Sequence, residues 1–435
     1  MLSRFLILVL AAVAALDATA ATFTVNYTAG DLGDIDPGDG ECAWATFPPP
    51  DMRCTLRAAI IEANALPGAD VIIVPLGAYI LLDNPGRGDD GGGLGDLDIT
   101  DMLTISTPVL DIGARPVIDA DGLDRVFDIR PGAGSVQLAN LTITNGVADD
   151  ATTFAGGGIR AAGPGMLTLV YCELIGNIAN AGGAISVDTA SGRSLFVYDS
   201  HLHANGVFEF GITNPFGSAI KDSDGAPAAG VGISILRSTI SANLAFGTLQ
   251  RGAVHVKTPL TIQNSTLSLN LPTAILAQGT SVTLNHVTIT GSQTGYMFGG
   301  NALANASSLR NTIIAGNSAS DCQIFGSHSF SHSYSLDGDG SCDLGGFGVG
   351  NLPSTDPLLR PLTLVRGDTP VHYPGAGSPA IDHGDPAMEG SGGSCLSFDQ
   401  DDGPRPIDGD GGGARCDMGA VEFDDVIFAH GFDTP

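Results

Sequence analysis

A short motif recurs through the middle of the chain, and it constrains the fold more than any other feature. Two of its copies read Asn140-Leu-Thr-Ile-Thr-Asn145 and Arg237-Ser-Thr-Ile-Ser-Ala-Asn243. The central aliphatic residues follow one another at steps of 31, 28, 38, 27, 22 and 24 residues: Ile143, Leu174, Leu202, Ile240, Leu267, Ile289 and Ile313. A repeat of this length, with short β-branched strands and no helical periodicity, predicts a stacked solenoid.

Glycine turns lie between the copies of this motif. They precede an aliphatic residue in Gly156-Gly-Gly-Ile159 and Gly182-Gly-Ala-Ile185. A glycine turn followed by two or three short strands, with no helix between them, makes one coil of a parallel β-helix. We therefore predict an all-β chain that forms a right-handed, single-stranded parallel β-helix, with a short helical N-terminal cap and a loop-rich C-terminal domain.

Asparagine ends most copies of the motif. In stacked coils such side chains can form a hydrogen-bonded ladder, while the aliphatic residues stack inside. The asparagines expected in this ladder are Asn145, Asn177, Asn205, Asn243, Asn270 and Asn317.

The first twenty residues have the pattern of a secretory signal peptide. Arg4 gives a positive start, an apolar run follows up to Leu16, and Ala18-Thr-Ala20 is a small-residue cleavage site. The run is too short to span a bilayer, and no later stretch qualifies as a transmembrane helix. We expect an exported bacterial protein, extracellular or on the outer-membrane surface.

The cysteines fit export. Six of the seven lie close together in pairs, which we expect to form disulfides: Cys42 with Cys54, Cys322 with Cys342, and Cys395 with Cys416. Each such bond stabilises a fold by about 2–4 kcal/mol. The seventh, Cys172, lies within a repeat strand and is expected to be a buried, inert thiol.

The formal net charge of −29 excludes nucleic acid as a partner, because such a surface repels phosphate backbones and anionic membranes. The same charge disfavours an anionic polymer as a ligand unless a cation such as calcium bridges the two.

The N-terminal region resembles the CSLREA-domain family of exported bacterial proteins. The resemblance lies in Cys54-Thr-Leu-Arg-Ala-Ala-Ile60, Pro67-Gly-Ala-Asp70, Gly95-Asp-Leu-Asp-Ile99 and Asp124-Arg-Val-Phe127. Independently of this resemblance, Leu56, Ala59, Ile60 and Ala63 recur at helical spacing, which predicts a short helix that Thr55 begins as N-cap and Pro67-Gly68 ends. Ala58 stands where the family has a glutamate, so half of a capping box is missing.

The C-terminal region resembles the choice-of-anchor Q domain. The matching segments are Ser378-Pro-Ala-Ile-Asp382, Asp399-Gln400, Gly403-Pro-Arg-Pro-Ile-Asp-Gly-Asp410 and Ala414-Arg-Cys-Asp-Met-Gly-Ala-Val-Glu422. These patterns together divide the chain into five parts. We predict a signal peptide at 1–20, an N-terminal cap at 21–100, β-helix repeats at 101–335, an anchor-associated domain at 336–423 and a tail at 424–435. The tail is either a sorting tag or a last strand that covers the coil end.

Candidate catalytic residues are confined to the early coils, because residues 225–320 contain no aspartate or glutamate. The candidates are Glu173, Asp199, His201, Lys221 and Asp222. The alternative is an ordinary solvated strand face, since alternate strand positions face water anyway. His201 and His203 share a face and could bind a metal, but the sequence offers no clear third ligand.

Aspartate- and glycine-rich loops are candidates for structural calcium, which prefers carboxylate and carbonyl oxygens. The best placed acids are Asp337, Asp339 and Asp343, and Asp408 and Asp410, beside the predicted disulfides. The alternative is solvated turn aspartates.

Together these features predict a non-enzymatic, adhesin-like β-helix whose long faces bind polysaccharide or a cell-surface component. The alternative is a polysaccharide lyase or glycoside hydrolase that uses acids of the early coils. The two readings differ in one respect: an enzyme requires three or more acids from residues 173–224 to converge in a groove with Lys221. A homodimer is compatible with the sequence, which does not fix the oligomeric state.

Overall fold

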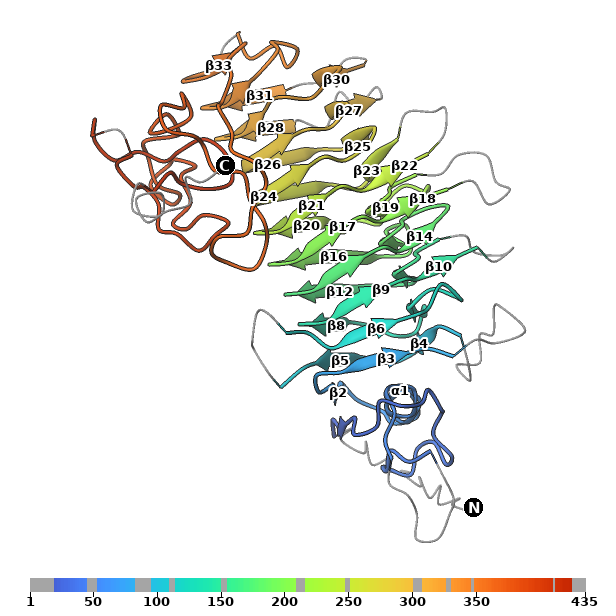
Figure 1. Ribbon diagram of the computed structural model, residues 1–435. Helices are drawn as coiled ribbons and strands as arrows, with labels where there is room; N and C mark the ends of the chain where they lie inside the picture. Colours follow the sequence, from blue (N-terminus) through green and yellow to red (C-terminus); the bar gives the residue numbers. More distant parts are fainter. Residues whose placement is uncertain are drawn as a thin grey trace, which may run out of the picture.

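The computed structural model describes residues 19–44, 53–82, 95–108, 114–149, 155–208, 216–246, 251–299, 307–325, 330–345, 348–409 and 411–424. These residues form a right-handed parallel β-helix, as the sequence predicts (Figure 1). The helix α1 (Leu56–Ala65) lies at the N-terminal end of the rod. The predicted signal peptide lies outside the described residues, apart from Thr19 and Ala20.

The coils from β2 to β30 run through three long parallel columns, and β24 and β26 each pass through both the first and the second column. The first column consists of β1 (Thr22–Thr24), β2 (Asp70–Ile73), β5 (Leu103–Ser106), β8 (Val136–Ala139), β12 (Gly165–Val170), β16 (Arg193–Tyr198), β20 (Ile233–Leu236), β24 (Leu260–Ser268), β26 (Val282–Thr290), β28 (Ser307–Arg310) and β31 (Phe330–Ser333).

The second column carries the recurring motif. It consists of β3 (Ala78–Ile80), β6 (Val117–Asp119), β9 (Thr142–Thr144), β13 (Glu173–Ile175), β17 (His201–His203), β21 (Thr239–Ser241), the second halves of β24 and β26, β29 (Ile313–Ile314), β32 (Leu336–Asp337) and β33 (Leu352–Pro353).

The third column is a separate nine-stranded sheet within the described residues. It consists of β4 (Leu97–Ile99), β7 (Phe127–Ile129), β11 (Ile159–Ala161), β15 (Ile185–Val187), β19 (Ile220–Asp222), β23 (Gly252–Val256), β25 (Thr273–Gln278), β27 (Thr294–Gly299) and β30 (Ser320–Ile324). Four short strands make a small sheet between the second and third columns: β10 (Val147–Ala148), β14 (Ile178–Ala179), β18 (Gly206–Val207) and β22 (Leu244–Ala245).

The motif aliphatics stack in register along the second column. Ile143 pairs with Leu174, Leu174 with Leu202, and the series continues through Ile240, Leu267 and Ile289, all fully buried. The prediction is wrong by one residue in the last copy, because Ile289 pairs with Ile314 and Ile313 pairs with Thr288. The spacing to the closing asparagine was the available signal, because Asn317 lies three residues after Ile314, as Asn177 does after Leu174.

Left-handed backbone corners flank the motif strand in successive coils. On the entry side the corner residues are Asn140, Tyr171, Asp199, Arg237, Asn264, His286, Asn311 and Tyr334, with φ between 42° and 55°. For a residue other than glycine this conformation costs roughly 1–2 kcal/mol. It persists here because the paired strands on either side fix where the chain must turn.

The asparagine ladder exists over four coils. Asn177 donates from Nδ2 to Oδ1 of Asn205, Asn205 to Asn243 and Asn243 to Asn270, each at 3.0 Å. Each Oδ1 also accepts the backbone N–H of the asparagine one coil earlier, at 3.0–3.2 Å. All four side chains are fully buried, so the ladder satisfies polar groups that would otherwise lose their water.

The predicted ladder is wrong at Asn145 and is interrupted before Asn317. Asn145 is exposed and sits at the left-handed corner, where its Nδ2 donates to Asp119 Oδ1. The ladder position in that coil belongs to Gly146, whose N–H donates to Asn177 Oδ1. At the other end Asn317 Oδ1 accepts the N–H of Ser292 one coil earlier, so Ser292 separates Asn317 from Asn270, and Asn317 Nδ2 donates to Asp321 Oδ1.

The N-terminal helix begins at Thr55, as predicted. The Thr55 hydroxyl accepts the N–H of Ala58, and the helix ends at Ala65, just before Pro67. Arg57, at 1% exposure, forms an ion pair with Asp31 at 2.8 Å and so ties the preceding loop to this cap.

The three predicted disulfides are present: Cys42–Cys54, Cys322–Cys342 and Cys395–Cys416. Cys172 is a free, fully buried cysteine, and burial raises the pKa of its thiol to about 11. A thiol in that environment stays protonated, as expected for an inert core residue.

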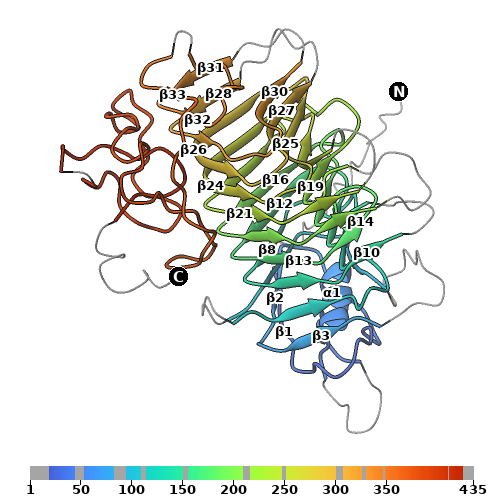
Figure 2. The same cartoon turned by 45° about the horizontal axis from the view of Figure 1, so that its top comes forward.

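Residues 354–424, hereafter the C-terminal segment, pack against the side of the later coils, next to β24, β26 and β28 (Figures 1 and 2). They reach the outward hydroxyls of the second column. Gln400 accepts from Thr266 Oγ1 at 2.7 Å and donates to Thr239 Oγ1 at 2.8 Å. His372 Nε2 lies 2.8 Å from Ser268 Oγ. The outward hydroxyl residues of these coils, where no carboxylate occurs, therefore form the surface on which the C-terminal segment packs.

We predict that Asn243→Ala lowers the free energy of unfolding by about 3–5 kcal/mol. The change removes the bonds of Asn243 to Leu202, Asn205 and Asn270, and leaves buried donors without partners. Urea unfolding followed by far-UV circular dichroism measures the loss. Asn145→Gly is the control, because the following coil has Gly176 at that corner; an equal loss there would contradict a ladder confined to the buried asparagines.

Candidate functional site

Glu173, His201 and His203 come together on the outward face of the second column. Strands alternate, so Leu174 and Leu202 point into the core and their neighbours point out. Glu173 on β13 pairs in register with His201 on β17. The three residues are half-buried, and their ligand atoms all lie within 4.8 Å of one another.

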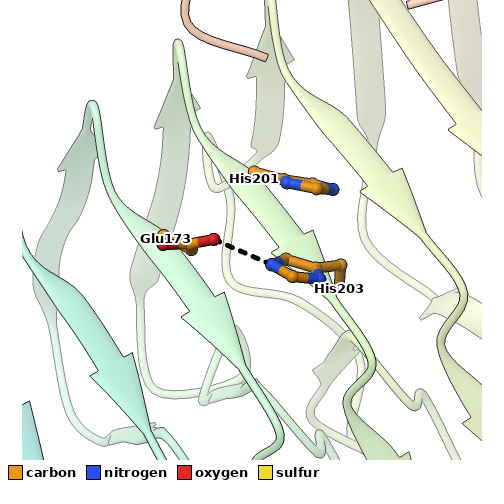
Figure 3. Close-up of side chains that lie close together, drawn as sticks. All are labelled: Glu173, His201 and His203. Atoms are coloured by element: carbon orange, nitrogen blue, oxygen red, sulfur yellow. Dashed lines mark hydrogen bonds and ion pairs between the residues drawn. The ribbon is translucent and has the colours of Figure 1, made fainter. Parts of the chain in front are cut away.

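Direct contacts hold these three side chains in place (Figure 3). Glu173 Oε1 lies 2.9 Å from His203 Nε2. The two imidazole rings stack with their centroids 4.0 Å apart and an interplanar angle of 14°. His201 Nε2 lies 2.8 Å from Ser241 Oγ in the next coil. The carboxylate and both rings are thus held by neighbours before any ligand arrives.

The other oxygen of the carboxylate faces the preceding coils. Thr142 Oγ1 donates to Glu173 Oε2 at 3.3 Å, and Arg115 Nη1 lies 4.0 Å from the same oxygen. Arg115 is itself fixed, because its Nε donates to the carbonyl of Tyr171 at 2.8 Å. Glu173 therefore uses one oxygen for orientation and presents the other to His203.

The surroundings of these three side chains set their protonation states, and those states suit the binding of a cation. The hydrogen bond from His203 lowers the pKa of Glu173, so the carboxylate is ionised at neutral pH. Burial lowers the pKa of His201 to about 3, and the imidazole is neutral.

A second charged group lies where the C-terminal segment meets the early coils. Arg237 donates from Nε to Asp199 Oδ1 at 2.6 Å and reaches Asp402 at 3.2 Å. Burial, with the nearby Asp199, raises the pKa of Asp368 to about 6. Asp199 thus forms a bidentate ion pair with Arg237 and does not join Glu173.

Lys221 and Asp222 lie on a different face, in β19 of the third column. Lys221 Nζ contacts Asp222 Oδ1 at 3.3 Å and Asp224 Oδ1 at 3.1 Å, and it is only 3% exposed. Asp222 Oδ2 accepts the backbone N–H groups of Lys257 and Thr258. Of the candidate acids, Asp222 contacts Lys221, whereas Glu173 and Asp199 lie at the second column and do not join it.

The predicted calcium ligands are only partly brought together. Asp337 and Asp339 form a group of three with Asp321, beside the Cys322–Cys342 disulfide, while Asp343 is not in this group. Their oxygens accept local backbone N–H groups, for example Asp337 Oδ2 from Cys342. Asp408 accepts from Gly411, and Asp410 lies outside the described residues.

A charged cluster that the sequence analysis missed lies on the third column. Its members are Asp96, Asp98, Asp128, Arg125, Arg130 and Arg160. Asp98, Asp128 and Arg160 stack in register. Burial raises the pKa of Asp96 to about 8, although Arg125 Nε lies 3.3 Å from its Oδ2. Asp98 and Asp128 recur one coil apart, and this recurrence could have revealed the cluster from the sequence. Every acid here faces an arginine, so we interpret the cluster as an ion-pair ladder between coils.

Comparisons with known proteins do not place the chain in a family. No protein-family model and no curated protein matches the sequence, so the CSLREA and choice-of-anchor Q resemblances remain predictions. The chain is similar to a solved structure described as pectate lyase Pel9A, at 13% identity and a TM-score of 0.47, over 94% of this chain and 98% of that one. A likeness at that level carries no information about activity.

Across the described ranges, no helix is both long and apolar enough to cross a membrane.

We predict that acid selectively removes the stability that His201 contributes. Its folded-state pKa of about 3 lies below the value of about 6.5 in an unfolded chain. Between these values only the unfolded chain binds the proton, so acidification favours unfolding. From about pH 7 to about pH 5 the stability advantage of the wild type over His201→Gln should shrink by about 2 kcal/mol. Urea titrations at both pH values, in the presence of a chelator, measure it, and a constant difference would contradict the buried, neutral imidazole.

Proposed function

We propose that this chain is an exported β-helix protein that binds polysaccharide or a cell-surface component without altering it. The observation that carries the proposal is the separation of the candidate acids. Glu173 lies with two histidines, Asp199 pairs with Arg237, and Lys221 lies on another column. A glycosidase needs two carboxyl groups on either side of one bond, and Glu173 and Asp199 are each engaged with a separate basic side chain.

The early coils also carry a partly exposed pair of aromatic side chains on the first column. On β16 the rings of Phe196 and Tyr198 lie 6.0 Å apart at an interplanar angle of 22°, and both are half-buried. Thr168 and Ser234 flank Phe196 in register on the neighbouring strands. Flat aromatic rings among hydroxyl groups suit a sugar chain, because each ring offers an apolar face at low entropic cost.

Export is part of the same proposal. Three disulfides are consistent with an oxidising compartment, and the N-terminal pattern is that of a signal peptide. The net charge of −29 favours neutral glycans over acidic ones as ligands.

The test is binding to a panel of neutral and acidic polysaccharides, by affinity electrophoresis and calorimetry. We expect binding to a neutral glycan that Phe196→Ala weakens about tenfold, since the loss of one stacked ring is worth about 1.4 kcal/mol. Phe325→Ala, which removes an exposed phenylalanine elsewhere, should leave the affinity unchanged. Release of reducing ends or of unsaturated uronides during the assay would overturn the non-enzymatic assignment in favour of a hydrolase or lyase.

A further inference from the structure

We propose that Glu173, His201 and His203 form a binding site for a transition-metal ion such as Zn²⁺, on the outward face of β13 and β17. The proposal does not depend on the binding of carbohydrate. It rests on the position of the three side chains in the repeat, on their geometry, and on the residues that hold them in place.

The repeat itself marks these residues as exceptions. At the same two outward positions the neighbouring coils carry hydroxyl residues: Thr142 and Thr144 before them, Thr239 and Ser241, then Thr266 and Ser268 after them. Glutamate and two histidines replace this pattern only in β13 and β17 within the span from β9 to β24, and those two strands are paired. Stacking needs none of these side chains, because the inward Leu174 and Leu202 maintain the core.

The ligand chemistry selects the class of ion. Two imidazoles and one carboxylate, with a fourth position open to water, are a ligand set of zinc sites that are not purely structural. Calcium prefers an all-oxygen shell of six to eight ligands, which this group does not supply. Imidazole nitrogen also suits Cu²⁺, Ni²⁺ and Co²⁺, so the site should follow the usual order of affinities among these ions.

The geometry requires a modest adjustment. The ligand atoms lie within 4.8 Å of one another, whereas tetrahedral zinc needs them about 3.3 Å apart. The rings now stack at 4.0 Å, so one imidazole must rotate out of the stack to point at the ion. His203 and Glu173 already meet at 2.9 Å and need the smallest change.

The surrounding residues act as an outer shell. Thr142 and Arg115 hold Glu173 through Oε2, which leaves Oε1 for the ion. The Ser241 hydroxyl contacts one ring nitrogen of His201 and can orient the ring for coordination through the other. The charge of Arg115 opposes a cation, but it acts on the oxygen that His203 does not use.

The test uses the full chain after removal of bound metal with a chelator. Calorimetric titration with Zn²⁺ should give one ion per chain, and Co²⁺ should produce visible d–d absorption that Zn²⁺ abolishes. His203→Gln and, separately, Glu173→Gln should each weaken Zn²⁺ binding by at least about tenfold. Excess Ca²⁺ should not displace Co²⁺, because this site supplies too few oxygens.

His383→Gln is the matched control, since it removes an exposed imidazole outside the group. Circular dichroism of the metal-free variants verifies that each one folds, and half-exposed Glu173 is the variant least expected to disturb the coil. Binding of Zn²⁺ with equal affinity by the wild type, Glu173→Gln and His203→Gln would overturn the proposal. So would the absence of saturable Zn²⁺ binding below about 1 mM.

Discussion

The structure depends on the in-register stacking of one coil on the next. Buried aliphatic residues supply the apolar part of that stacking, and the ladder from Asn177 to Asn270 satisfies the polar groups beside it. Left-handed corners such as Tyr171 and Arg237 are strained on their own and are tolerated because the paired strands fix the turn. Since register fixes which side chains face out, it also decides which residues can meet between coils.

The C-terminal segment divides the outward face of the second column into two parts. Over the later coils it covers Thr239, Thr266 and Ser268, which are almost completely buried. Over the early coils Glu173 and His203 keep 30% and 21% of their side-chain surface exposed. The hydroxyl residues at these outward positions therefore have a structural reason, because a carboxylate there would lie unsolvated under the segment.

The sequence was sufficient for the fold, because the motif encodes inward aliphatics, glycine turns and asparagines within each coil. It failed by one residue at Ile313 and at Asn145, because neither choice keeps the three-residue spacing between inward aliphatic and ladder position that the other coils share. The matching positions of Glu173 and His201 were also visible in the repeat. The covering of the later coils was not, because contacts such as Thr266 with Gln400 join residues 134 apart and no local pattern encodes them.

The most direct test of this account compares the labelling of two single-cysteine variants at equivalent outward positions. Thr144→Cys and Ser268→Cys lie in one register line of the second column, and the native Cys172 is fully buried. If the C-terminal segment covers only the later coils, a maleimide should modify Thr144→Cys at least about tenfold faster than Ser268→Cys under native conditions. Equal rates for the two variants would contradict the division of this face into an open part and a covered part.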